Sequence, residues 1–136
     1  MTIFGAYIEH HHLEVRIEAR FEPPTLHLHK WTKEELTKGY YLNDYAAWVS
    51  IDKWDALNKN DIHIYVDQEP VKKRHKRLII KHKLLVPRGI LDVTSPGGHF
   101  VEHSEHEIRL SYENVKLRVY RTSFQEFEFY INQAKS

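Results

Sequence analysis

Apolar and charged side chains alternate along several stretches of this chain, and this alternation restricts its fold more than any other feature. The clearest stretch covers residues 13–20. Its apolar members are Leu13, Val15, Ile17 and Ala19, and its charged members are Glu14, Arg16, Glu18 and Arg20. A period of two residues puts the two kinds of side chain on opposite faces of a β-strand. The stretch therefore predicts a strand with one buried and one solvated face.

The same alternation recurs further along the chain. It is found at residues 62–66, 78–86, 108–110, 115–119 and 127–131. Turn-forming residues separate these stretches, and the link at residues 112–114 is short enough to join its neighbours as a hairpin over residues 108–120. Repeated short strands between turns predict an all-β fold, an antiparallel β-sandwich of about eight strands.

One segment interrupts the β pattern and predicts a short α-helix near residues 32–39. Thr32 can cap the helix N-terminus, with Glu35 three residues on completing a capping box, and Gly39 supplies a C-terminal stop. A helix of about two turns is too short to be stable alone. We therefore expect Trp31 and Leu36 to hold it against the edge of a sheet.

Composition sets the size and class of the protein. The 136 residues are 41% hydrophobic, which is enough for one domain, residues 1–136, with its own core. No apolar run approaches the roughly 20 residues of a membrane span, and the N-terminus lacks the pattern of a secretory signal, so we expect a cytoplasmic protein without a membrane partner. The absence of cysteine excludes disulfides, thiolate metal sites and cysteine nucleophiles.

Charge is distributed unevenly although the formal net charge is only +1. Residues 71–88 contain eight lysines and arginines and no acidic residue, which gives +8. Residues 41–69 contain six acidic and two basic residues, which gives −4. Any electrostatic recognition must therefore come from one of these regions rather than from the molecule as a whole.

Histidines invite a metal hypothesis, which the spacing does not support. His99, His103 and His106 lie near Glu102 and Glu105, but they match no closed zinc motif, and HEXXH is absent. We expect ordinary surface histidines, with no metal and no cofactor.

Catalytic signatures are equally absent from the sequence. There is no GxSxG motif and no phosphate-binding glycine loop. Carboxylate pairs such as Asp52 and Asp55 are common in any chain with 19 acidic residues. We expect a protein that is not an enzyme.

The basic region suggests an alternative function, a nucleic-acid-binding β module that uses residues 72–83. Lysine and arginine neutralise phosphates, and Tyr65 lies nearby in the sequence. Apolar residues thread the run, however, and it lacks the interleaved aromatics that stack on bases. A solvated, edge-protecting strand face is the interpretation that we favour, and direct nucleic-acid binding remains the alternative.

Aromatic residues gather between positions 40 and 54, in the acidic region. The five rings belong to Tyr40, Tyr41, Tyr45, Trp48 and Trp54. We expect Tyr45 and Trp48 to be core residues around the short helix. Trp54 is the better candidate for an exposed anchor in a protein interface, where tryptophan often provides much of the binding energy.

The segment around the predicted helix also carries a family resemblance. Trp31-Thr32, Glu34, Leu36, Lys38 and Gly39-Tyr40 resemble the signature region of the competence protein J (ComJ) family, in which a Trp-Thr pair, a short helix and a Gly-Tyr pair follow an N-terminal strand. The surrounding elements agree in order. They are the strand at 13–19, the Pro23-Pro24 corner, the run 46–51, the stretch 85–90 and the predicted hairpin.

The resemblance implies an all-β cytoplasmic protein that binds and inhibits a cognate DNase of the NucA type. Immunity proteins of bacterial toxin systems are similar in this logic, since each is small, non-enzymatic and made to block one nuclease. The implied partner is therefore the cognate nuclease toxin or a NucA-like DNase.

An inhibitor of this kind commonly presents carboxylates to a cationic, phosphate-binding cleft, because complementary charge speeds and orients association. The −4 region and the acidic segment 102–107 contain such carboxylates. The expected interface residues are Asp52, Trp54, Asp55, Glu102 and Glu105. Their carboxylates would replace substrate phosphates, and inhibition would follow from occlusion of the active site.

Overall fold

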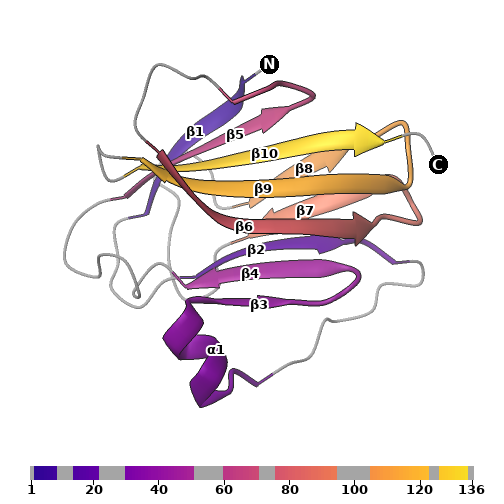
Figure 1. Ribbon diagram of the computed structural model, residues 1–136. Helices are drawn as coiled ribbons and strands as arrows, with labels where there is room; N and C mark the ends of the chain where they lie inside the picture. Colours follow the sequence, from indigo (N-terminus) through magenta and orange to yellow (C-terminus); the bar gives the residue numbers. More distant parts are fainter. Residues whose placement is uncertain are drawn as a thin grey trace.

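The computed structural model describes residues 2–8, 14–21, 30–50, 60–70, 76–94, 105–122 and 126–134, with the backbone alone at 2–8, 14, 60–62, 105 and 106. Within these ranges the chain forms ten strands and one short helix (Figure 1). In chain order they are β1 (Thr2–Ile8), β2 (Glu14–Ala19), α1 (Lys33–Lys38), β3 (Tyr40–Leu42), β4 (Ala46–Ser50), β5 (Asn60–Val66), β6 (Lys76–Leu85), β7 (Ile90–Thr94), β8 (Glu105–Arg109), β9 (Asn114–Thr122) and β10 (Glu126–Ala134).

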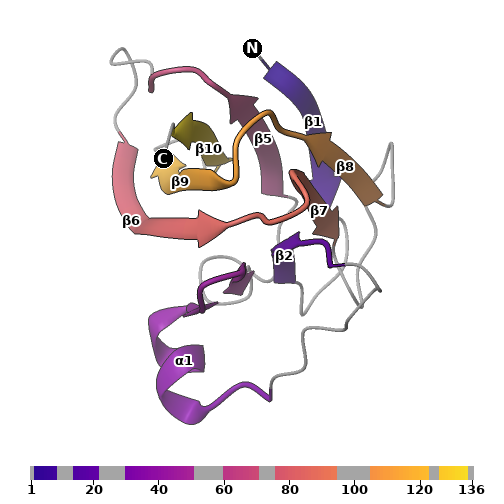
Figure 2. The same ribbon diagram turned by 90° about the vertical axis from the view of Figure 1, so that its right-hand side faces the viewer.

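The strands form two five-stranded sheets. The first sheet has the order β1-β5-β10-β9-β6, and the second has the order β3-β4-β2-β7-β8. Neighbouring strands are antiparallel except β5 and β10, which are parallel. Figure 2, which looks toward the ends of several strands, shows the first sheet curving from β6 to β1. The predicted all-β class is confirmed, with β1, β3, β4 and β7 added to the strands that the alternation indicated.

Apolar side chains between the two sheets form the core. The first sheet contributes Ile64, Ile80, Leu84, Val115, Leu117, Val119, Phe127, Phe129 and Ile131, and the second contributes Val15, Ile17, Ala19, Ala47, Val49, Leu91, Val93 and Ile108. Most of these residues are two apart along their strands, as the alternation requires. Burial of one face of each strand is therefore what holds the sheets together.

At one corner of the sandwich the chain passes between the sheets twice. β6 leads into β7 through a turn that ends at Gly89, and β8 leads back into β9. Backbone hydrogen bonds join the two connections: Val86 donates to the Glu113 carbonyl and Leu110 donates to the Gly89 carbonyl, each at 2.7 Å. Gly89 has a φ of +67°, and a Cβ there would lie 2.9 Å from the Leu110 carbonyl oxygen. This position therefore requires glycine.

The crossing shows that the predicted hairpin over residues 108–120 was wrong. β8 belongs to the second sheet and pairs with β7, while β9 belongs to the first sheet and pairs with β6. The link at 112–114 is short, but it changes sheets instead of returning the chain beside itself. Alternation reports which face of a strand is buried, and it does not report the sheet to which the strand belongs.

The helix α1 has the predicted ends. Thr32 and Glu35 form both halves of the capping box, and Gly39 adopts the left-handed conformation with φ 93°. The expected contact through Leu36 was wrong, because this side chain is 48% exposed. Trp31 makes the contact instead, with its ring centre 6.1 Å from that of Trp48. No helix in the described ranges has the length and apolar character to cross a membrane.

Candidate functional site

The side chains of the interface residues expected from the sequence are not among those that the structure describes. Asp52, Trp54, Asp55 and Glu102 lie outside the described residues. Glu105 begins β8 opposite Thr94, and its backbone alone is described. The proposed acidic interface therefore stays a prediction.

The side chains of the histidine-rich segment are likewise not among those that the structure describes. His99 and His103 lie outside the described residues, and His106 is described by its backbone alone. Among the side chains that are described, no three or more histidine, aspartate or glutamate residues are grouped as they would be around a metal ion.

Trp48 lies on the outer face of the second sheet and is nevertheless only 1% exposed. The guanidinium carbon of Arg16 lies 3.8 Å from the centre of its ring, and the ring of Tyr41 packs edge-on at 5.2 Å. Its indole nitrogen donates a hydrogen bond to Glu18 at 3.1 Å. Trp48 is therefore a structural residue. Tyr45 packs against the core between the sheets, so the expectation for this ring is confirmed. For Trp48 the expected burial is confirmed, on the outer face of the sheet.

Further along the outer face of the second sheet, opposite charges meet across neighbouring strands. Arg20, just after β2, donates from Nε to Asp92 of β7 at 3.0 Å and pairs with Glu107 of β8. Arg109 lies 3.2 Å from the other oxygen of Glu107. The hydrogen bond to Asp92, with a further contribution from Glu107, raises the pKa of Arg20 above its ordinary value. Asp92 and Glu107 on this face are therefore already neutralised by arginines.

The basic segment of β6 does not act as one uniform face. Lys76, at its start, donates to Glu128 of β10 at 2.5 Å, and both side chains are almost fully buried, at 9% and 4% exposed. The Tyr130 hydroxyl donates to the same carboxylate at 2.8 Å. Lys76 therefore satisfies a buried carboxylate. It adds little to a surface for external phosphates. Residues 72–75 of the alternative site lie outside the described residues, so the alternative over residues 72–83 stays a prediction.

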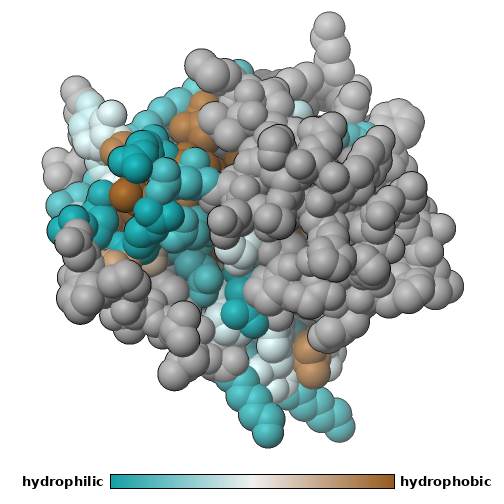
Figure 3. Space-filling model, turned by 180° about the vertical axis from the view of Figure 1, so that it is seen from behind, coloured by the Kyte–Doolittle hydropathy of each residue, from teal (hydrophilic) through white to brown (hydrophobic). Residues whose placement is uncertain are grey.

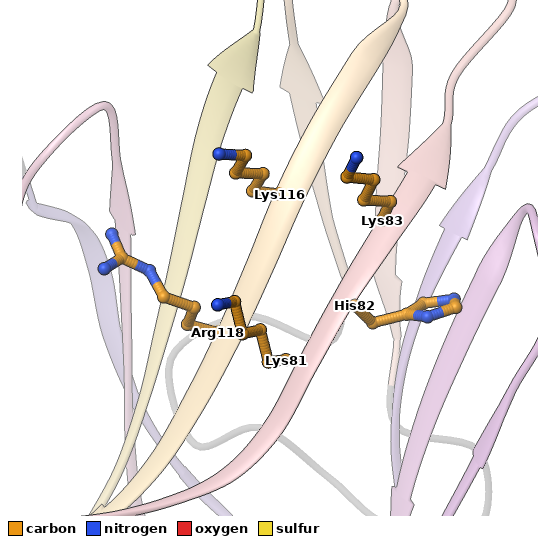
Figure 4. Close-up of a pocket in the computed structure, with 5 residues that line it drawn as sticks. All are labelled: Lys81, His82, Lys83, Lys116 and Arg118. Atoms are coloured by element: carbon orange, nitrogen blue, oxygen red, sulfur yellow. The ribbon is translucent and has the colours of Figure 1, made fainter.

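Further along β6 the basic side chains do reach the surface. Lys81 and Lys83 lie on the outer face of the first sheet and are joined there by Lys116 and Arg118 of β9. These four side chains line a hollow of about 410 Å³. Figure 4 shows how they project from β6 and β9. We call these four residues the cationic face.

His82 also borders the hollow, and Figure 4 shows it on the other side of β6. Its Nε2 lies 2.6 Å from the carbonyl oxygen of Asn43, in the connection between β3 and β4. The backbone nitrogen of Leu85 donates to the carbonyl of Asp44 at 2.8 Å. His82 therefore helps to close the seam between the two sheets.

Few described partners balance the cationic face. Arg118 lies 3.3 Å from Glu69, which is 82% exposed, and donates to Asn132 at 2.9 Å. No described carboxylate pairs with the three lysines of the face. Four cations beside one open hollow form a surface that attracts anions.

Sequence reasoning missed the contribution of β9 to this face. Lys116 and Arg118 alternate with Val115, Leu117 and Val119, so the pattern already indicated that both point outward. It did not show that β9 lies beside β6, because Lys116 follows Lys83 by 33 positions in the sequence. The β6–β9 pairing brings the two sets of cations together.

Apolar surface is limited in the described part of the chain. Its large exposed apolar side chains are Leu36, Leu78, Leu85 and Tyr112. Seen from behind, the coloured surface is mainly hydrophilic, with small brown areas (Figure 3). The described residues therefore offer no broad apolar docking surface.

This architecture, a sandwich of two five-stranded sheets with one short helix beside β3, is similar to that of a solved bacterial protein structure. The solved structure in question is ComJ, inhibitor of the DNA degrading activity of NucA, from Bacillus subtilis. The two chains superpose with a TM-score of 0.67 over 98% of each, at 10% sequence identity. The protein thus has a ComJ-like fold. No protein-family model and no curated protein matches its sequence.

Proposed function

We propose that this protein is a bacterial nuclease inhibitor that binds a cognate DNase in the cytoplasm. It forms a 1:1 complex with the DNase and blocks its active site without catalysing a reaction. The observation that carries the proposal is the ComJ-like fold, which extends over 98% of both chains. The family resemblance of the Trp31–Tyr40 segment supports it from the sequence. The partner is a nuclease toxin or a NucA-like DNase, as in competence or toxin–immunity systems.

The proposed interface contains Asp52, Trp54, Asp55, Glu102 and Glu105. On the outer face of the second sheet the described carboxylates Asp92 and Glu107 are paired with arginines, so they are poorly suited to meet a cationic cleft. The acidic residues at 52–55 and 102–105 are the better candidates to take the place of substrate phosphates.

The proposal is tested by titrating the nuclease encoded beside this gene, because inhibitor genes commonly lie next to the gene that they neutralise. DNA cleavage should fall linearly with added protein and stop at one equivalent, provided that the nuclease concentration exceeds the Kd. The equivalence point should follow the nuclease concentration and stay the same when the DNA concentration is doubled. Undiminished cleavage and no co-purification with the nuclease would contradict the proposal.

The interface is tested separately by reversing two charges. Asp52→Lys combined with Asp55→Lys should weaken inhibition about 100-fold, because each carboxylate becomes a charge that the cleft repels. Glu34→Lys combined with Glu113→Lys is the matched control, since both residues are exposed and the net charge changes equally. Equal inhibition by the two double variants would show that the interface lies elsewhere.

A further inference from the structure

We propose that the cationic face, formed by Lys81, Lys83, Lys116 and Arg118, is a second binding site that holds the phosphodiester backbone of duplex DNA without reading its sequence. This activity goes beyond nuclease inhibition and does not depend on it. It also differs from the site suggested by the sequence, because Lys76 is excluded and two residues of β9 are included.

The first argument is the register of the two strands. Lys81 lies directly opposite Arg118, and Lys83 lies directly opposite Lys116. Like charges directly across neighbouring strands destabilise a sheet. Both pairs are like-charged, so the face opposes folding unless an anion neutralises it. Departures from local consistency of this kind concentrate at functional sites.

The second argument is accessibility. Lys81, Lys83 and Lys116 are exposed, and the hollow beside them is open. Of the four cations, Arg118 is the one with a described carboxylate partner, and that partner, Glu69, is 82% exposed at 3.3 Å. Such a solvated contact is weak and can be exchanged for a phosphate oxygen.

The third argument distinguishes DNA from an acidic protein. Stable protein interfaces have a desolvated core in which lysine is depleted and aromatic anchors are common. Three of the four residues here are lysines. The rings on the same outer face are not fully exposed, since Tyr130 is only 1% exposed and Tyr65 and Tyr120 are half-buried against it. The exposed Leu78 and Leu85 lie at the two ends of β6, outside the lysine pair. Surface cations without an anchor are typical of phosphate contacts.

The same features define the mode of binding. Exposed aromatic platforms that stack on unpaired bases are absent from the described part of this face, so the phosphates are the ligand. Four phosphate contacts predict a slope of about −3.6 for log K against log salt on duplex DNA, and a Kd of roughly 10⁻⁴ to 10⁻⁶ M at physiological salt.

The experiment measures the fluorescence anisotropy of a labelled 30-base-pair duplex titrated with the full chain at several salt concentrations. The test variant is Lys81→Glu with Lys83→Glu. The control is Lys30→Glu with Lys33→Glu, which changes the net charge equally at two exposed lysines near α1. The wild type and the control should bind alike. The test variant should bind at least about tenfold more weakly, with a slope smaller in magnitude by about 2.

Three outcomes of the DNA titration would overturn the proposal. They are no salt-dependent binding by the wild type, equal binding by the test variant, or an equal loss in the control. Tighter binding to polyglutamate than to DNA at the same charge concentration would assign the face to an acidic protein instead. No nuclease is present, so failure here leaves the inhibitor function intact. Failure of inhibition likewise leaves this result intact.

Discussion

The outer faces of the two sheets carry charge in opposite ways. On the second sheet, the acidic Asp92 and Glu107 lie directly opposite each other, and Arg20 and Arg109 neutralise them. On the first sheet, the cationic face places lysines and an arginine opposite one another. The two patches have the same number of charged groups, and they differ in whether the fold itself balances them.

This difference separates structural charges from charges available to a ligand. A balanced cluster contributes to folding and has little residual field, whereas a patch of one sign opposes folding and attracts counter-ions. Lys76 shows that position decides the role even within one strand, because it balances the buried Glu128 while Lys81 and Lys83 remain unbalanced. A basic segment in a sequence is therefore not a single functional unit.

The largest effect should come from removing the cation of the buried Lys76–Glu128 ion pair. Lys76→Met would leave Glu128 buried without its cation and should destabilise the fold by about 3 kcal/mol, which urea unfolding would measure. Lys76→Met combined with Glu128→Leu should recover most of this loss, because the uncompensated charge is then absent. A single variant as stable as the wild type would show that the pair is not structurally important.

A smaller loss of stability should follow from removing the arginine that pairs with Asp92 and Glu107 on the surface. Arg20→Met should destabilise the protein by about 1 kcal/mol, since one guanidinium serves two carboxylates that remain partly solvated. Arg109→Met is the matched control and should have less effect, because Arg109 is 73% exposed and contacts Glu107 alone in this cluster. Equal losses in thermal denaturation would argue against the special role of Arg20.

The pH dependence of this contribution follows from Arg20. The hydrogen bond to Asp92 and the further contribution of Glu107 raise its pKa above the ordinary value, so its folded pKa exceeds its unfolded pKa. Stability from such a group is fully present below the unfolded pKa and is lost only as pH rises through the folded one. Titration of the guanidinium should therefore not alter the difference between wild type and Arg20→Met from pH 6 to 9.

The smallest effect should have the opposite sign. Lys81→Glu would place a carboxylate directly opposite Arg118 and should stabilise the fold by about 0.5 kcal/mol, measured by urea unfolding. The same variant should bind DNA more weakly, and its gain in stability would exclude unfolding as the cause. A loss of stability would contradict the view that the cationic face opposes folding.

Much of the local structure could be predicted from the sequence. The capping box and Gly39 defined the helix, and alternation identified strands such as β2 and β9, because these signals depend on residues near one another. β3 was not predicted, since three residues are too few to show a period. Leu36 was wrongly expected to be buried, because helix periodicity does not say which neighbour will cover a side chain.

The candidate sites could also be predicted from the sequence only in part. The acidic residues at 52–55 and 102–105 remain predictions for the proposed inhibitor interface. On the cationic face, alternation indicated that Lys116 and Arg118 point outward, while their place beside Lys81 and Lys83 required the strand order. Long-range neighbours are chosen by burial of the whole core, which no short segment encodes.

The sequence by itself determined the β class of this protein, its one short helix and the residues that face outward on its clearest strands, because propensity, capping and periodicity act within a few residues. The tertiary structure decided which charges meet. It paired Lys76 with Glu128, placed Arg20 between two carboxylates, and gathered four cations from β6 and β9 on one face. Electrostatic interactions depend on distance in space, and sheet topology sets that distance.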